Sequence, residues 1–111
     1  MTVDSEVPRI NLDNANGTTS DNSLDIKINK LLVSKEKLTK IEKITFLTSG
    51  FTHDNKDDFE CFIVSHYKEL EGLIKNMAPG AKIIFYHERK SFSFEVRLVK
   101  NILEIVESDP H

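Results

Sequence analysis

The longest regular pattern of apolar positions lies in residues 59–77. Apolar side chains recur there at intervals of three and four, which places them on one face of a helix. Asp57 and Asp58 precede the pattern, where a helix favours negative charge, and Pro79-Gly80 follows it, where a helix ends. The pattern predicts one long amphipathic helix over residues 56–77, whose apolar face is formed by Phe59, Phe62, Ile63, Tyr67, Leu70, Leu73, Ile74 and Met77.

Three other segments have the patterns of strands. Residues 44–48 are short, rich in β-branched side chains and bounded by Ser49-Gly50. Residues 82–87 form an apolar run of strand length, and apolar and polar residues alternate strictly over residues 91–98. Because a short polar loop separates the last two segments, they predict an antiparallel hairpin with one buried face.

The two ends of the folded region have weaker patterns. Leu and Ile recur at helical spacing over residues 24–42 and predict a helix, although residues 24–28 also alternate as a strand would. Ser34 is placed to cap a shorter helix that begins at Lys35. The last apolar segment, residues 102–106, fits a short helix, and the alternative is a turn at Lys100-Asn101 into another strand.

These elements predict an α+β fold, in which a small, mostly antiparallel sheet of about three strands packs against the long helix. The single domain spans residues 23–111. Residues 1–22 are dominated by polar side chains without a period, and they predict a disordered tail. The alternative for this tail is a docking peptide within residues 7–12.

A second interpretation places a buried strand at residues 59–65 and starts the helix near His66. With the strand at residues 82–86 it would form a βαβ unit and an α/β fold. That arrangement, with its Pro79-Gly80 turn, is similar to the second half of a Rossmann-like methyltransferase sheet. The resemblance covers about 30 residues. The glycine-rich loop that would hold the cofactor is absent, so the resemblance implies no cofactor.

Charge and cysteine content restrict the class of protein. The net charge of −3 comes entirely from residues 1–22, which hold four acidic residues and one arginine. The balanced remainder gives no global attraction to nucleic acid or to an anionic membrane. Cys61 is the one cysteine and is expected to be a small buried hydrophobe. No apolar run is long enough to span a bilayer, and an intracellular, cytoplasmic protein is expected, with the nucleus as an alternative.

Candidate chemistry is limited to one short motif. Glu88-Arg89-Lys90 has the Glu-x-Lys form of metal-dependent nuclease sites, which need a second carboxylate to hold Mg²⁺. Asp57 or Asp58 would have to supply it. A solvated hairpin loop is the simpler interpretation. The histidines show no zinc-ligand spacing, and His66 is expected to be packed or half-exposed beside the apolar face of the helix.

Binding without catalysis is therefore the expected function: a subunit, adaptor, inhibitor or other regulatory protein that contacts another protein or its own copies. Ser93, Glu95 and Arg97 share the outer face of the last predicted strand, which could pair with a partner if it lies at a sheet edge. Lys35, Lys37 and Lys40 lie in the most basic segment and are the candidates for nucleic-acid binding. Nucleic-acid binding and metal-dependent nuclease activity are the two alternative functions. No cofactor, metal or membrane partner is expected.

Overall fold

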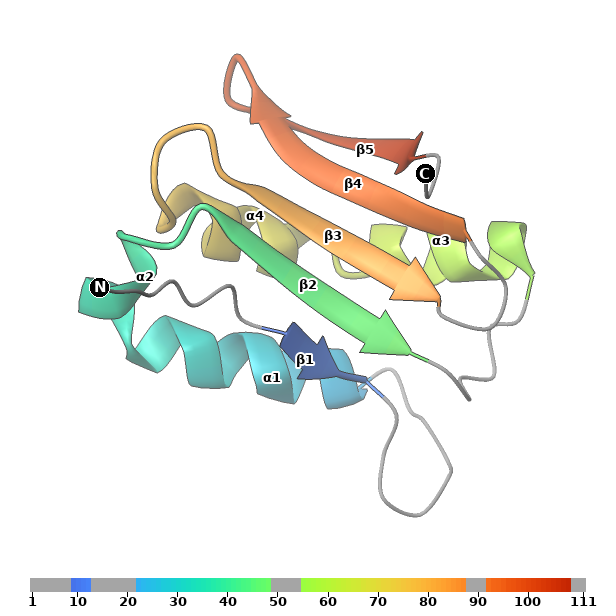
Figure 1. Ribbon diagram of the computed structural model, residues 1–111, viewed down its shortest axis with the longest axis horizontal. Coiled ribbons are helices and arrows are strands. Elements are labelled where there is room, and N and C mark those ends of the chain that lie inside the picture. Colours follow the sequence, from blue (N-terminus) through green and yellow to red (C-terminus); the bar gives the residue numbers. More distant parts are fainter. Residues whose placement is uncertain (1–8, 13–21, 49–54, 88–91, 109–111) are drawn as a thin grey trace, which may run out of the picture.

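The computed structural model describes residues 9–12, 22–48, 55–87 and 92–108. Five strands form one sheet in the order β1-β2-β3-β4-β5 (Figure 1). The elements along the chain are β1 (Arg9–Asn11), α1 (Asn22–Val33), α2 (Lys35–Leu38), β2 (Lys43–Thr48), α3 (Lys56–Val64), α4 (Tyr67–Lys75), β3 (Lys82–His87), β4 (Phe92–Val99) and β5 (Ile102–Ser108).

The sheet is mixed. β1, β2 and β3 are parallel neighbours, joined by helical crossovers, whereas β3, β4 and β5 form an antiparallel meander. The predicted hairpin of residues 82–87 and 91–98 is present as β3 and β4. The predicted small, mostly antiparallel sheet of three strands is wrong, because the crossovers through the helices make β1, β2 and β3 parallel and β1 and β5 extend the sheet on both sides.

The helices and the sheet enclose one hydrophobic core. Both crossovers step in the same direction across the sheet, so right-handed connections place their helices on the same face. Helices α1 and α4 are in contact, and Figure 1 shows α3 and α4 behind the sheet. Phe59 of α3 lies at the centre of an aromatic cluster, with its ring 6.4 Å from Phe85 and 6.1 Å from Phe94. Phe46 and Phe85 stack across β2 and β3 at 5.0 Å.

The predicted long helix of residues 56–77 is two helices. Asn55 begins α3 as expected of a cap, since its side chain accepts a hydrogen bond from the Asp58 backbone at 2.8 Å. The helix ends at Val64, and the Ser65 hydroxyl and His66 Nδ1 both lie within hydrogen-bond distance of the Phe62 carbonyl, at 2.7 and 2.9 Å. These contacts satisfy a carbonyl at the end of α3. The apolar spacing continues across the break because each short helix buries its own stripe on the sheet.

The predicted helix of residues 24–42 is likewise divided. Helix α1 ends at Val33, and α2 begins at Lys35, the start that the Ser34 alternative proposed, but the Ser34 side chain forms no capping hydrogen bond. The strand alternative for residues 24–28 and the strand alternative for residues 59–65 are both wrong, because α1 and α3 occupy them. The chain does contain βαβ units, but they start from β1 and β2.

Both ends of the chain add a strand that the favoured interpretation lacks. Residues 9–11 of the predicted tail form β1, and Leu12 is fully buried in the core. The rest of that tail, residues 1–8 and 13–21, lies outside the described residues. The segment 102–108 is strand β5 and not a short helix. Lys100 and Asn101 both have positive φ, 55° and 67°, which is the two-residue turn of a tight hairpin.

Candidate functional site

The helices cover one face of the sheet and leave the other face uncovered by any described residue. In β2 and β3 every second side chain is buried under the helices, and the side chains between them are only half-buried. The strand registers continue this alternation across all five strands. This side of the sheet is termed the open face, and only Ser93 is buried within it; it consists of Arg9, Asn11, Lys43, Thr45, Leu47, Lys82, Ile84, Tyr86, Ser93, Glu95, Arg97, Val99, Ile102, Glu104 and Val106.

The middle of the open face is apolar. Leu47 of β2 lies beside Tyr86 of β3, and Ile84 lies in the next row. Val106 of β5 lies in the same row as Ile84, with Glu95 of β4 between them, and is 40% exposed. An apolar area surrounded by polar side chains is the composition of the centre of a protein-binding patch.

One end of the open face carries three cations in adjacent strands. Lys43, Lys82 and Arg97 are in register on β2, β3 and β4 and are termed the cationic row. Like charges directly opposite one another destabilise a sheet. Arg97 is relieved by Glu95 at 3.5 Å and by Glu104 at 3.9 Å, but Lys43 and Lys82 form no ion pair with any described residue. The row is therefore available to an acidic group of a partner.

The three predicted interaction residues on β4 lie together on the open face. Ser93 is 5% exposed, whereas the Arg97 side chain is 47% exposed. The side chain of Glu95 lies between them and is 20% exposed. The condition attached to this prediction, that their strand lies at a sheet edge, is not met, because β5 pairs with β4 along its whole length.

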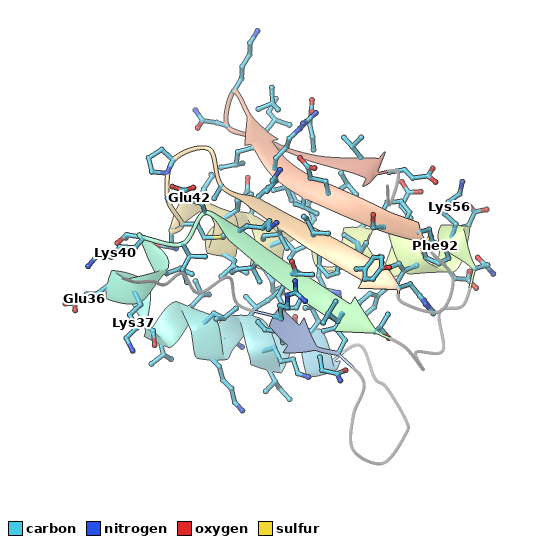
Figure 2. All side chains as sticks on the ribbon, viewed as in Figure 1. Glu36, Lys37, Lys40, Glu42, Lys56 and Phe92 are labelled. Atoms are coloured by element: carbon cyan, nitrogen blue, oxygen red, sulfur yellow. The ribbon has the colours of Figure 1, made fainter. Side chains whose placement is uncertain are left out.

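The predicted lysine group lies elsewhere. Lys35 and Lys37 are on α2 and Lys40 is in the turn after it, and all three are exposed. Figure 2 shows Lys37 and Lys40 at the end of the molecule opposite Phe92 and Lys56. Their side chains form no ion pair with described residues. The structure therefore does not join them to Ser93 and Glu95 in one site.

Strand β5 forms an uncovered edge of the sheet. It pairs with β4 without a bulge from Ile102 to Ser108, and no described strand lies on its outer side. Ile102 is 62% exposed. The glutamate at position 107 makes an ion pair of 3.1 Å with Lys56, which fixes the end of β5 to α3. Sequence reasoning missed this edge, although the Lys100-Asn101 turn was the signal for it.

His66 is a structural residue. It is 4% exposed, its Nδ1 donates to the Phe62 carbonyl, and its Nε2 lies 3.5 Å from an Asp25 carboxylate oxygen. The neighbouring Ser65 hydroxyl donates to the same Phe62 carbonyl, and its oxygen lies 3.2 Å from His66 Nδ1. Because that nitrogen carries the proton donated to Phe62, it is not placed as a base toward the Ser65 hydroxyl. The expected packed histidine is confirmed. Its contacts hold α1 against the break between α3 and α4.

The described residues do not bring together the predicted nuclease site. Glu88 and Lys90 lie outside the described residues, and Asp57 and Asp58 are exposed in the first turn of α3. No group of three or more histidine, cysteine, aspartate or glutamate side chains that could hold a metal ion occurs among the residues described. Cys61 is exposed and not the buried hydrophobe that was expected.

A shallow depression lies between the end of α4 and the β4–β5 turn. Its volume is about 260 Å³, below the range of about 300–1,000 Å³ that is typical of ligand pockets. Met77, Pro79 and Leu98 contribute apolar walls, and Lys75 is its one charged lining residue. Without converging polar groups it is not a candidate active site.

Comparison with protein-family models, with curated proteins and with solved structures finds no match for this chain. Among the described residues, no helix has the length and apolar character that crossing a bilayer requires. The candidate site therefore rests on the open face and on the edge at β5.

Proposed function

We propose that this protein is a non-catalytic binding module that docks another protein on the open face of its sheet. The observation that carries the proposal is a sheet with one face covered by helices and the other face not covered by any described residue, with an apolar area on β2 and β3. Leu47, Ile84 and Tyr86 provide the apolar contact, and the cationic row selects a partner with acidic groups beside an apolar segment.

A protein partner is favoured over nucleic acid by the composition of this surface. Tyr86 is the one aromatic side chain among the described residues of the open face, whereas single-stranded nucleic acid is bound by several stacking rings. Glu95 and Glu104 form ion pairs with Arg97 of the cationic row, and their negative charges would repel phosphates. An intracellular, cytoplasmic setting fits the exposed Cys61 thiol, because reducing compartments keep such thiols free.

The test compares the full chain with two double variants. Ile84→Thr with Tyr86→Thr removes apolar surface from the open face and keeps strand propensity at position 84. Val33→Thr with Val64→Thr removes exposed apolar surface from the helices and is the matched control; the two valines are 84% and 50% exposed. Each protein is immobilised, incubated with nuclease-treated lysate of the source cells, and its captured proteins are quantified by mass spectrometry.

We expect the wild type and the helix control to capture the same partner protein. The open-face variant should capture about tenfold less of it, which corresponds to a loss of roughly 1.4 kcal/mol of binding free energy. Identical captured sets for all three would contradict the proposal. Two further outcomes would replace it. Salt-sensitive binding of DNA that is lost with Lys35→Gln, Lys37→Gln and Lys40→Gln would favour a nucleic-acid protein. Mg²⁺-dependent cleavage that is lost in Glu88→Ala would favour a nuclease.

A further inference from the structure

The outer side of β5 lacks most of the features that protect sheet edges. Natural edge strands are kept short, bulged, interrupted by proline, covered by another element or supplied with charged side chains, and β5 has only the charged side chains, Glu104 and Glu107. β5 is seven residues long and in continuous register with β4, and it contains no proline. Two of its open-face side chains, Ile102 and Val106, are large, apolar and exposed. Such an edge is suited to pairing with another strand.

The sequence of β5 is self-complementary in the antiparallel direction. Residues 102–106 have the order apolar, apolar, glutamate, apolar, apolar, which is symmetric about Glu104. When a second copy pairs antiparallel about Glu104, Ile102 lies opposite Val106 of the second copy on the open face. On the helix-covered face, Leu103 lies opposite Ile105 of the second copy. The same two contacts recur on the other side of the two-fold axis, as an isologous interface requires.

The charges favour this register and this partner. The two Glu104 carboxylates face each other across the axis, and each has the Arg97 guanidinium of its own chain 3.9 Å away. The two arginines, each also 3.5 Å from Glu95 of its own chain, offset part of the repulsion between the two Glu104 carboxylates. Pairing about Ile105 would instead set Leu103 against Glu107 and Val106 against Glu104, so apolar side chains would face charged ones.

We propose that a second copy of this chain pairs with the first through β5, antiparallel and centred on Glu104, to form a two-fold symmetric dimer. The two sheets then form one ten-stranded sheet with all helices on one side. The two open faces become a continuous surface with a cationic row in each half. This inference deepens the proposed function by identifying one partner as the chain itself, and it leaves the open face free for a different protein.

The first measurement is the mass of the full chain in solution. Sedimentation equilibrium or light scattering from about 1 to about 500 μM covers the affinities of modest interfaces. We expect a concentration-dependent rise from the 12.7 kDa monomer to about twice that mass. Ile102→Lys with Val106→Lys should raise the dissociation constant by at least about a hundredfold, since lysines on an edge strand block pairing. Val33→Lys with Val64→Lys is the matched control and should leave it unchanged.

The second measurement tests the register by disulfide formation in a Cys61→Ser background. Glu104→Cys places a thiol opposite itself across the axis, with Cβ atoms about 4.5–5.5 Å apart, near disulfide distance. Ile102→Cys is the control, because its copies would lie about 14 Å apart, at about 3.4 Å for each of four residues. Mild oxidation should cross-link Glu104→Cys at least about tenfold faster than Ile102→Cys.

A mass that stays at the monomer value over the whole concentration range would overturn the inference. A dimer in which Ile102→Cys or Ile105→Cys cross-links and Glu104→Cys does not would also overturn it, since another register or surface would then form the interface. Both results are separate from the capture experiment. A monomer that still retains a protein through Ile84 and Tyr86 keeps the proposed function, and a cross-linked dimer that captures nothing removes the proposed function alone.

Discussion

The two outer strands of the sheet differ in how their free sides are protected. β1 has three residues, leads directly into the fully buried Leu12, and is in contact with α1 through Lys27, whose Nζ donates to the Asn11 carbonyl. β5 has seven residues, and Ile102 and Val106 on its open face are exposed. One edge is thus short and contacted by a side chain of α1, whereas the other is long and regular and exposes apolar side chains. An edge left in that condition is expected to serve association.

The largest effect expected from this comparison is on stability. Leu12→Ala removes a fully buried side chain at the end of β1 and should lower the free energy of unfolding by about 2–5 kcal/mol. Ile102→Thr at the β5 edge should change it by about 0.5 kcal/mol or less, because the side chain is exposed and threonine keeps the β-branch. Urea denaturation of the dilute proteins measures both. Equal losses in the free energy of unfolding would show that Leu12 and Ile102 contribute equally to stability.

A smaller effect is expected where α1 contacts β1. Lys27→Met keeps the alkyl chain and removes the ammonium that donates to the Asn11 carbonyl, so we expect a loss of about 0.5–1.5 kcal/mol in the free energy of unfolding. Lys30→Met on the same helix is the matched control, since Lys30 is exposed and makes no contact with β1 that the structure describes. Thermal unfolding of the two variants should differ by a few degrees. If the two variants unfold at the same temperature, the contact between Lys27 and β1 does not stabilise the protein.

The smallest effect is expected from the charges at the β5 edge. Glu104→Gln removes one exposed partner of Arg97 and should change the free energy of unfolding of the dilute protein by about 0.5 kcal/mol or less. Glu95→Gln removes the other partner of Arg97 on the central strand β4 and serves as its comparison. A loss above about 1 kcal/mol for Glu104→Gln would show that this ion pair, and not backbone pairing with β4, holds β5 in place.

The sequence by itself determined the elements whose pattern is local. A short β-branched segment identified β2, an apolar run followed by strict alternation identified the β3–β4 hairpin, and the apolar spacing identified the helical segments that cover the sheet. It also placed Ser93, Glu95 and Arg97 on one face, because side chains two apart in a strand share a face. The predicted start of the helix at residue 56 agrees with α3, where the Asn55 side chain satisfies a backbone donor without any distant partner.

Tertiary structure decided the features that depend on distant partners. A three-residue strand within a polar segment has no detectable period, and β1 exists because its residues pair with β2 and because Leu12 enters the core. Residues 102–106 carry apolar side chains at positions that suit either a helix or a strand, and pairing with β4 selected the strand. At the break, Ser65 and His66 contact the Phe62 carbonyl, and His66 Nε2 lies 3.5 Å from Asp25 of α1, a distant contact that the local spacing does not report. These long-range contacts also decide which strands are parallel and which edge of the sheet stays open. The stability of a strand depends on the strands beside it and not on its own sequence alone.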